Sequence, residues 1–421
     1  MNTKILVVSN EALANTSSNG RTLRNFLLNI PKEQLAQFYI HGEPDDGVCS
    51  DFYRVSDKDA LNAFLFKKRK ESTVKNAPTS NGNKKINKNC RTMVIRDIVW
   101  KSYRWWTKDF DSFVKRFSPD VIFLQAGDAP FMYDLTMKLS RKYNLPIIMY
   151  NSEEFVLKEK LYSGAKKNSI WHKWLKRRLE KSYKKIMQTV KHCIYNTEFL
   201  EQQYQKRYPH QGKSSVLYTV SELERMADKT DKAHFNLLYC GNLGVGRVDP
   251  LDEIAKVLYC VDNAATLDVY GRFVNEEDEK KLCSNLNVRY GGVVSYETVK
   301  SLMSEASMLV HCENKDRLAN LRGAFSTKIA DSLASGKPFL VYAIKEYPFV
   351  QYLDENQSAH IATDPCELEK VLRDCINNAY YRVKYVGNAV CLAAENHRSS
   401  KNAQKMCNLI ESIEKTCQQK T

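Results

Sequence analysis

Apolar residues recur along the chain in short runs separated by longer amphipathic stretches, and this alternation predicts strands and helices in regular succession. Four apolar runs of the first half are short enough to be buried strands, namely Lys4–Ser9, Gln37–Ile40, Asp120–Leu124 and Leu145–Tyr150. Apolar residues at helical spacing occur between them, in Gly20–Leu28 and Phe131–Tyr143. Strands that alternate with helices in this way are typical of a parallel sheet covered by helices.

The second half repeats the pattern. Its predicted strands are Asn236–Cys240, Thr266–Tyr270, Met308–His311 and Phe339–Tyr342. Its predicted helices are Pro250–Tyr259, Tyr296–Ser304 and a run that begins near Ser326 and ends at Gly336. We therefore expect an α/β fold with two doubly wound domains that face each other across a cleft, with ligands bound outside the carboxyl ends of the strands.

Two polar stretches interrupt this order. Residues 68–92 are rich in Lys, Asn, Ser and Thr and predict a flexible loop, and Gly212–His234 predicts a linker. The predicted N-terminal domain therefore covers residues 1–215 and the predicted C-terminal domain residues 235–395. In residues 396–421 we expect a C-terminal helix, spanning Ser400–Lys415, that packs along one or both domains.

The composition is that of a soluble globular protein. Of the 421 residues, 43% are apolar and 27% are charged, and no apolar run is long enough to span a membrane. Met1–Asn10 lacks the long apolar region and the cleavage site of a signal peptide, so we expect a cytoplasmic protein. The twelve cysteines form no CxxC pair and have no metal-ligand spacing with His, which favours reduced thiols.

The positive charge of the chain is concentrated in its first half. Residues 1–215 hold 39 Lys and Arg against 21 Asp and Glu, whereas residues 216–421 hold 25 against 28. This asymmetry indicates an acidic partner for the first half only, either a nucleic acid or an anionic membrane surface.

Ala324–Leu340 contains the first candidate binding element. Ser326 or Thr327 can cap the predicted helix, whose first turn then presents free N–H groups and the positive end of the helix dipole. Lys328 lies in that turn, where the dipole disfavours a cation, so we expect an external anion such as a phosphate. Asp331, one turn further on, can accept hydrogen bonds from two ribose hydroxyls. The alternative is a capped core helix on which Lys328 and Asp331 are solvated.

Lys337, in the same stretch, is a weaker candidate for a phosphate ligand. A P-loop of the form GxxxxGK[ST] would need Gly at position 331 and Ser or Thr at position 338, where the chain has Asp331 and Pro338. Gly336 is better explained as the residue that ends the helix.

Tyr239–Val248, with the sequence YCGNLGVGRV, is the second candidate element. Its glycines allow a ligand to approach the backbone, and Arg247 can bind phosphate oxygens through two N–H groups. Their spacing differs from the dinucleotide fingerprint GxGxxG, so we do not infer NAD. In the first half, a strand and a polar loop form Ser9–Arg21, in which Asn19 and Gly20 face the ligand unless the loop is an ordinary turn.

Several of these motifs together resemble a known family. Gly241-Asn242-Leu243-Gly244 with Arg247, and Phe325–Ile329 with Asp331 and Gly336-Lys337-Pro338, look like GT-B glycosyltransferases of the large retaining group 1/family 4 type. Asn19–Leu23, Gln125–Asp128 and Tyr150–Glu153 are similar to a bacterial subset of that group linked to surface polysaccharide assembly. The resemblance covers nearly the whole chain. It implies two Rossmann-like domains, of which the N-terminal one binds the acceptor and the C-terminal one the nucleotide-sugar.

The resemblance also implies roles for individual residues. Arg247 resembles the family's diphosphate-binding basic residue, and Asp331 takes the place of the second Glu of the family's E-x7-E pattern, which binds the ribose. The donor-binding residues implied are Gly241, Asn242, Gly244, Arg247, Gly271, Ser326, Thr327, Lys328 and Asp331. The cleft or acceptor residues implied are Asn19, Gly20, Gln125 and Glu153.

One position departs from the family pattern. The first Glu of E-x7-E would be residue 323, which is Gly323. The contact from that Glu to the donor sugar is therefore absent or supplied elsewhere, and Glu313 and Asp316 are nearby candidates. No motif identifies the catalytic group. Our candidate is Asp128, at the end of a predicted strand of the first domain.

We expect no metal and no cofactor, because the nucleotide-sugar, whose base the sequence leaves open, is the substrate. Asp109-Phe110-Asp111 has the DxD form of metal-dependent GT-A enzymes, but it follows a Trp-rich basic stretch rather than a core strand. GT-B enzymes typically stabilise the leaving diphosphate with a helix dipole and basic side chains instead.

All five tryptophans fall in two basic segments. Trp100, Trp105 and Trp106 lie in Lys84–Lys108, and Trp171 and Trp174 lie in Lys158–Lys191. Trp beside Lys and Arg suits a lipid headgroup layer, so we predict that these residues contact an anionic membrane. The alternatives are core tryptophans under a solvated basic face, or a nucleic-acid site, for which no signature motif is present.

The expected function is therefore that of a hexosyltransferase-type, metal-independent glycosyltransferase, peripheral to the inner face of the cell membrane. It would transfer a sugar to a lipid-linked or oligosaccharide acceptor in bacterial surface polysaccharide assembly, with retention of configuration. One alternative is a GT-B-fold sugar-nucleotide epimerase, which would leave the basic Trp segments unexplained. The other is a nucleic-acid-binding or scaffold protein, which would leave Gly241–Arg247 and Ser326–Asp331 without a role.

Overall fold

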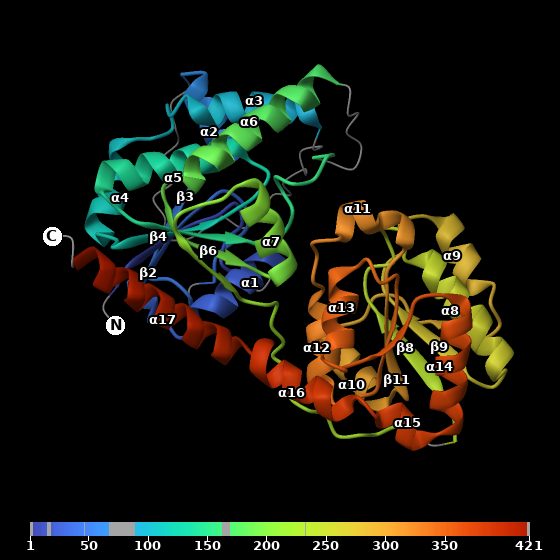
Figure 1. Cartoon of the computed structure of the whole chain (residues 1–421). Coiled ribbons are helices and arrows are strands. Elements are labelled where there is room, and N and C mark those ends of the chain that lie inside the picture. The colour runs from blue at the N-terminus through green and yellow to red at the C-terminus, as the bar shows by residue number, and fades with distance from the viewer. Residues whose placement is uncertain are drawn as a thin grey trace. The chain divides into compact units, whose positions relative to one another are not determined.

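Residues 3–14, 18–45, 47–66, 89–161, 169–231 and 233–418 are described by the computed structural model, in which the chain forms two compact units (Figure 1). The first unit comprises Met1–Tyr218 and Ser399–Thr421, and the second comprises Thr219–Arg398. Each unit has a parallel sheet between helices. This confirms the predicted α/β fold with two doubly wound domains.

The first unit contains a seven-stranded parallel sheet in the order β3-β2-β1-β4-β5-β6-β7. Its strands are β1 (Ile5–Val8), β2 (Leu35–Tyr39), β3 (Asp51–Arg54), β4 (Val121–Gln125), β5 (Ile147–Asn151), β6 (Val190–Tyr195) and β7 (Lys213–Val216). Its helices are α1 (Ser18–Leu27), α2 (Asp57–Phe64), α3 (Cys90–Lys101), α4 (Lys108–Phe117), α5 (Pro130–Tyr143), α6 (Ile170–Met187), α7 (Glu198–Arg207) and α17 (Ser399–Gln418).

The two faces of this sheet carry different helices, because successive residues of a strand point to opposite sides. Leu6 and Val8 of β1 join the aromatic-rich core to which α2 to α7 contribute. Ile5 and Val7 join the core on the other face, which also contains residues of α1 and α17. The sheet is therefore buried on both sides, as parallel sheets generally are.

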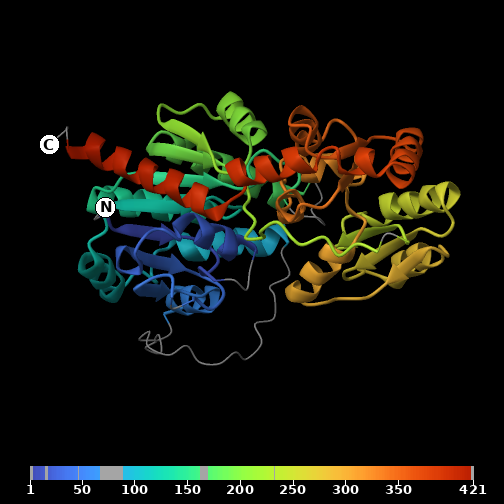
Figure 2. The same cartoon turned by 90° about the horizontal axis from the view of Figure 1, so that it is seen from below.

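The C-terminal helix α17 packs on the first unit, beside α1 (Figure 2). Its buried residues Met406, Leu409, Ile410 and Ile413 are spaced by three, one and three positions, so they lie on one face of the helix and enter the core. Asn402 fixes the start of the helix, since its Nδ2 donates a hydrogen bond of 2.7 Å to the carbonyl oxygen of Tyr218.

A six-stranded parallel sheet, ordered β10-β9-β8-β11-β12-β13, forms the centre of the second unit. Its strands are β8 (Asn236–Cys240), β9 (Thr266–Tyr270), β10 (Val288–Tyr290), β11 (Met308–Cys312), β12 (Phe339–Tyr342) and β13 (His360–Ala362). Its helices are α8 (Val248–Val261), α9 (Glu276–Cys283), α10 (Tyr296–Glu305), α11 (Leu318–Leu321), α12 (Thr327–Ser335), α13 (Pro348–Glu355), α14 (Pro365–Asn377), α15 (Ala379–Val383) and α16 (Val386–Asn396).

Three strands of this unit, β8, β9 and β12, have the predicted bounds. The predicted linker Gly212–His234 is wrong at its start, because β7 runs over Lys213–Val216 as an edge strand beside β6. Of the predicted loop 68–92, residues up to 88 lie outside the described part of the chain, and Cys90 already begins α3. Among the described residues, no helix combines the length and the hydropathy needed to cross a bilayer.

Candidate functional site

The predicted donor-binding residues of the second unit meet where β8 and β11, neighbouring strands of its sheet, reach their carboxyl ends. The loop from β8 to α8 contains Gly241 to Arg247, and the N-terminus of α12 contributes Lys328. Loops at this edge of a parallel sheet are the usual ligand-binding elements of doubly wound folds.

Hydrogen bonds hold the β8–α8 loop in a defined shape. The Tyr239 hydroxyl donates to the Asn242 carbonyl oxygen at 2.9 Å, and the Asn242 side-chain oxygen accepts from the Gly244 N–H at 2.9 Å. Val245 and Gly246 have φ values of 57° and 80°, which lie in the left-handed region. The glycine at 246 adopts this conformation without strain, whereas Val245 does so at some cost, as residues of binding loops often do.

Lys328 lies directly against the backbone of Gly241. A Cβ atom at position 241 would be 2.0 Å from the Lys328 Nζ, so a side chain there would force the end of Lys328 to move. Burial and, to a lesser extent, the nearby charge of Arg247 lower the pKa of Lys328, Glu313 partly opposes them, and the net result is a pKa of about 8. The lysine is therefore held in a position that disfavours its own positive charge.

Arg247 forms a two-pronged ion pair with Glu313. Its Nε lies 3.1 Å from both carboxylate oxygens of Glu313, and its Nη2 also donates to Oε1. Both side chains are largely buried. Burial alone would lower the pKa of Arg247, but the pairing with Glu313 raises it above its usual value. Arg247 is thus fixed in place close to Lys328, and Glu313 compensates one of the two positive charges.

Two residues near the carboxyl end of β11, His311 and Asn314, complete the site and were not among the sequence-based candidates. His311 is buried 3.5 Å from Glu313, and burial together with Lys328 and Arg247 holds its pKa well below the ordinary value. Asn314 donates to the Gly246 carbonyl oxygen at 3.0 Å and to Asp249 at 2.7 Å, which ties the β11 end to the β8–α8 loop. Their position at a strand end was the signal that could have identified them.

The N-terminus of α12 has the predicted cap. The Ser326 hydroxyl accepts from the Lys328 N–H at 3.3 Å, while Thr327 is exposed and begins the helix. Gly336 ends the helix in the left-handed conformation. Asp331 accepts a hydrogen bond of 2.5 Å from the Ser221 hydroxyl. The role of Asp331 as a ribose ligand remains a prediction.

Gly271, just after β9, packs against the same loop. A Cβ atom at this position would lie 1.8 Å from the Gly241 carbonyl oxygen. The Gly241 N–H in turn donates to the Tyr270 carbonyl oxygen at 2.7 Å. Gly271 therefore supports the backbone of the site through close packing of two main chains.

Lys337 has a structural role. Its ammonium group donates to Asp228 at 2.6 Å and to the Ser304 carbonyl oxygen at 3.1 Å, and it also contacts the Thr230 hydroxyl. Of the two lysines of Ala324–Leu340, only Lys328 approaches Gly241.

The candidate residues of the first unit lie near the carboxyl ends of β1, β4 and β5, which are neighbours in its sheet. Gln125 is the last residue of β4 and is buried, and Asp128 is half-buried in the turn that follows. Glu153 follows β5 and pairs with Lys158 at 3.0 Å. Asn19 and the buried Gly20 lie in the first turn of α1, although the Asn19 side chain is outside the described part.

The tryptophans do not form one surface. Trp100 and Trp105 are almost fully buried, so the prediction that they contact a membrane is wrong for both. Trp100 stacks on Phe131, with ring centroids 4.8 Å apart, and Trp105 stacks on Phe38. The sequence pattern failed here because exposed basic residues such as Lys101 and Arg104 are close to both tryptophans in sequence while the indole rings point into the core.

The other three tryptophans differ from these. Trp106 is half-buried and donates from its Nε1 to Asp111 at 2.7 Å. Trp171 and Trp174, on α6, are 43% and 41% exposed. Asp111 also accepts from Lys142 and Tyr143, so this carboxylate of the DxD-like sequence is engaged by cationic and hydroxyl donors.

Comparisons with known proteins concern the fold. No protein-family model matches the chain, and no curated protein matches its sequence. Sucrose-phosphate synthase from Thermosynechococcus elongatus is similar in structure, with a TM-score of 0.63 and 11% identity over 98% of this chain and 100% of that one. Anabaena Alr3699/HepE in complex with UDP has a TM-score of 0.62 and 10% identity over 97% of this chain and 100% of that one.

A third solved structure agrees with these two. WaaG, a glycosyltransferase involved in lipopolysaccharide biosynthesis, has a TM-score of 0.59 and 13% identity over 96% of this chain and 98% of that one. In each case the match extends over both Rossmann-like units rather than over one sheet. The chain therefore has the GT-B glycosyltransferase fold.

Proposed function

We propose that the protein is a glycosyltransferase that takes its sugar from a nucleoside diphosphate sugar. The observation that carries this proposal is that two cations meet at the β8–α8 loop, where Lys328, in the first turn of α12, lies against Gly241 and the neighbouring Arg247 donates to the Asn242 carbonyl oxygen at 3.3 Å. Two cations and a helix N-terminus at one point favour a diphosphate, and they also stabilise the charge that develops on it as the sugar leaves.

The pKa of Lys328 supports an anionic ligand at this point. A lysine whose pKa is lowered by burial and by a neighbouring arginine regains a favourable environment when an anion binds beside it. In the free protein Glu313 partly neutralises Arg247. Before the donor binds, Glu313 keeps the Arg247 guanidinium in position. A bound diphosphate would then share Arg247 with Glu313.

The donor that we propose is a uridine diphosphate hexose. Anabaena Alr3699/HepE was crystallised with UDP, with UDP and glucose, and with UDP-glucose, which makes these the first compounds to test. Asp331 is our proposed ribose ligand, and Asp128 of the first unit is our proposed catalytic group. Transfer with retention of configuration and without a metal ion is part of the same proposal.

The acceptor that we propose is a lipid-linked saccharide in bacterial surface polysaccharide assembly, at the inner face of the cell membrane. The exposed residues Ile170, Trp171 and Trp174 at the start of α6 support this location, because exposed Lys173 and Arg177 flank them on the same helix. Indole rings beside basic side chains favour the headgroup layer of an anionic membrane.

Donor turnover tests the enzymatic part of the proposal. Release of UDP from UDP-glucose and other UDP-hexoses would be measured with and without bacterial lipid-linked saccharides. We expect acceptor-dependent release that falls at least about a hundredfold in Lys328→Met, because an electrostatic contact to the leaving group is lost. The exposed Lys370 on α14 provides a control, Lys370→Met, with wild-type turnover. Conversion of the donor to an epimer without transfer would contradict the proposal.

Cosedimentation with anionic vesicles tests the membrane part. Moving the exposed two-fifths of each tryptophan from water into the membrane would contribute about 2 kcal/mol to the binding free energy, at ~25 cal/mol per Å². We therefore expect Trp171→Ser/Trp174→Ser to weaken binding at least about tenfold, and Tyr380→Ser, at an 89% exposed position of the second unit, to leave it unchanged. Equal binding of both variants would exclude α6 as the membrane contact.

A further inference from the structure

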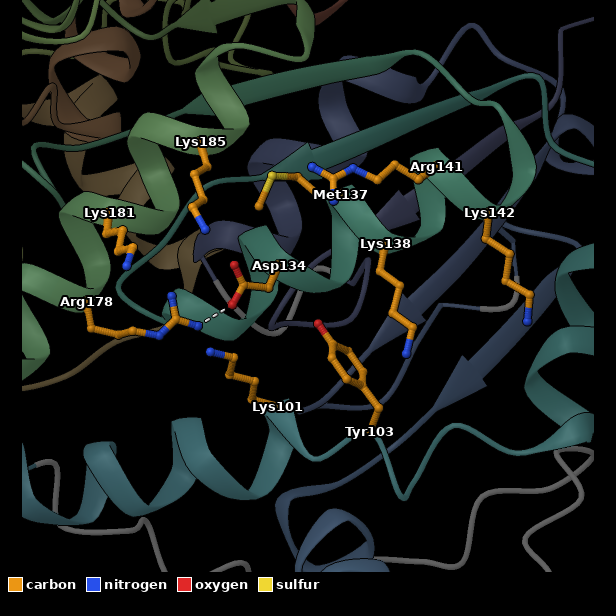
Figure 3. A pocket seen from close by; sticks show the side chains of 10 residues that line it. All are labelled: Lys101, Tyr103, Asp134, Met137, Lys138, Arg141, Lys142, Arg178, Lys181 and Lys185. Atoms are coloured by element: carbon orange, nitrogen blue, oxygen red, sulfur yellow. Dashed lines mark hydrogen bonds and ion pairs between the residues drawn. The ribbon is translucent and has the colours of Figure 1, made fainter.

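The helical layer of the first unit contains a strongly basic pocket between α3, α5 and α6 (Figure 3). It has a volume of about 610 Å³. Three of its ten lining residues are Tyr103, Asp134 and Met137. The remaining seven are basic and come from all three helices: Lys101, Lys138, Arg141, Lys142, Arg178, Lys181 and Lys185.

Only two of these basic side chains have a carboxylate partner in the described part of the chain. Arg178 pairs with Asp97 at 3.0 Å and also with Asp134, and Lys142 pairs with Asp111 at 2.7 Å. For the other five, no ion pair with a described carboxylate is formed. Several like charges therefore surround one cavity without a direct ion pair, although Asp97 and Asp111 attract Lys101 and Lys138 from further away, and this crowding costs free energy in the empty protein.

The pocket holds one of these lysines against an aromatic ring. The Lys138 Nζ lies 3.7 Å from the centroid of the Tyr103 ring. Burial lowers the pKa of Lys138, and the charge of Lys142 lowers it further. Tyr103, two residues beyond the end of α3, has a φ of 54°, a left-handed conformation that is uncommon for a bulky residue. In Figure 3 its hydroxyl points into the space between Lys101 and Lys138.

The same face of α6 connects the pocket with the exposed tryptophans. Trp171, Trp174, Arg178, Lys181 and Lys185 follow one another at intervals of three or four residues, so they form one stripe along the helix. The stripe begins with indole rings and ends with the basic residues of the pocket.

We propose that this pocket binds a compact polyanion, either a diphosphate or a phosphate monoester, at a site separate from the Lys328 site of the second unit. Lysine ammonium groups act as point charges and suit concentrated negative charge approached from several sides, whereas carboxylates are matched best by paired arginine N–H groups. Four of the five cations that form no direct ion pair with a described carboxylate are lysines. A phosphorylated lipid headgroup and a soluble phosphorylated compound share this chemistry.

Calorimetric titration of the full-length protein with inorganic pyrophosphate tests the pocket. Lys181→Gln/Lys185→Gln is expected to weaken pyrophosphate binding about 25-fold, at about fivefold for each lysine near an anion. The matched control is Lys184→Gln/Lys206→Gln, which removes the same charge from exposed positions of α6 and α7 outside the pocket. This control is expected to weaken binding less than about twofold.

A third variant, Lys328→Met, distinguishes pyrophosphate binding at the donor site from binding in the pocket. If pyrophosphate binding is lost in Lys328→Met and unchanged in the pocket variant, the anion binds at the second unit alone and the pocket proposal is overturned. It is also overturned if the pocket variant and its control lose affinity equally, since the effect would then be one of net charge. Absence of donor turnover in the wild type, with pyrophosphate binding through the pocket intact, would instead refute the proposed enzymatic function.

Vesicles identify the source of the phosphate. Vesicles of phosphatidylcholine with 30% phosphatidic acid present a phosphate monoester, and those with 30% phosphatidylglycerol present a diester at equal lipid fraction. A lipid headgroup is supported if the wild type prefers vesicles with phosphatidic acid, if the pocket variant lacks this preference, and if pyrophosphate removes it by competition. Pyrophosphate binding through the pocket, with vesicle binding unchanged in the variant, would support a soluble phosphorylated compound.

Discussion

Replacing Lys328 by methionine is expected to stabilise the free protein while weakening its affinity for nucleoside diphosphates. Burial and Arg247 lower the pKa of Lys328 from 10.5 to about 8, which corresponds to roughly 3 kcal/mol against the protonated form at ~1.4 kcal/mol per pKa unit. Part of the side chain reaches solvent, so we expect about half of this as a gain in the free energy of unfolding. Glu313 keeps its pairing with Arg247, so no buried carboxylate loses its partner.

The size of this stabilisation depends on pH in a defined way. Because the folded-state pKa lies below the unfolded value of 10.5, the unfolded chain binds the extra proton between pH 8 and 10.5, and the stability of the wild type rises with pH across that interval. The advantage of Lys328→Met should therefore be full at pH 7 and vanish above pH 10.5. At ~2–4 °C per kcal/mol, calorimetry at pH 7 should show a rise of about 3–6 °C in the melting temperature of the second unit.

Lys337→Met is the matched control, because Lys337 lies in the same stretch but donates to Asp228 and to the Ser304 carbonyl oxygen. Its loss should destabilise the second unit by about 1–3 kcal/mol, the opposite sign. A Lys328→Met protein that is less stable than the wild type, or whose gain is constant from pH 7 to pH 10.5, would refute the reasoning.

Three further predictions concern the same site. Affinity for a nucleoside diphosphate should fall above about pH 8 in the wild type, where free Lys328 loses its proton, and titration calorimetry should find no such fall in Lys328→Met. Arg247→Ala should lower stability by about 3–5 kcal/mol because Glu313 loses its buried partner, and Arg247→Ala/Glu313→Gln should recover most of it in urea unfolding without recovering nucleotide affinity. Gly271→Ala should cost about 2–4 kcal/mol, since its Cβ would lie 1.8 Å from a carbonyl oxygen, whereas Gly387→Ala, with nothing within 4 Å, should be neutral or stabilising in thermal melts.

The buried strands could be predicted because their apolar runs are continuous. Asn236–Cys240 and Phe339–Tyr342 are buried on both faces and have no polar alternation that would suggest another element. The edge strand β7 (Lys213–Val216) was missed because its side chains are Lys, Ser, Ser and Val. Its pairing depends on the neighbouring strand β6 rather than on local composition.

The candidate site could be predicted in part. Glycine spacing and a capping serine identified the β8–α8 loop and the start of α12, because both are local features. The pairing of Arg247 with Glu313 joins residues 66 positions apart, and the contact of Lys328 with Gly241 likewise depends on the sheet. The burial of Trp100 and Trp105 was only an alternative to the predicted membrane contact, because basic neighbours in the sequence do not reveal which side chains enter the core.

The central claim is that Arg247 and Lys328 form a diphosphate site in the second unit. It is tested most directly by a thermal-shift titration with the nucleoside diphosphates and UDP-sugars, on the wild type and on Lys328→Met. At a hundredfold excess over Kd, a bound ligand adds about 2.7 kcal/mol to the free energy of unfolding. We therefore predict that UDP or UDP-hexoses raise the melting temperature of the wild type by several degrees and leave that of Lys328→Met nearly unchanged. An equal shift in both proteins, or none with any nucleotide, would contradict the claim.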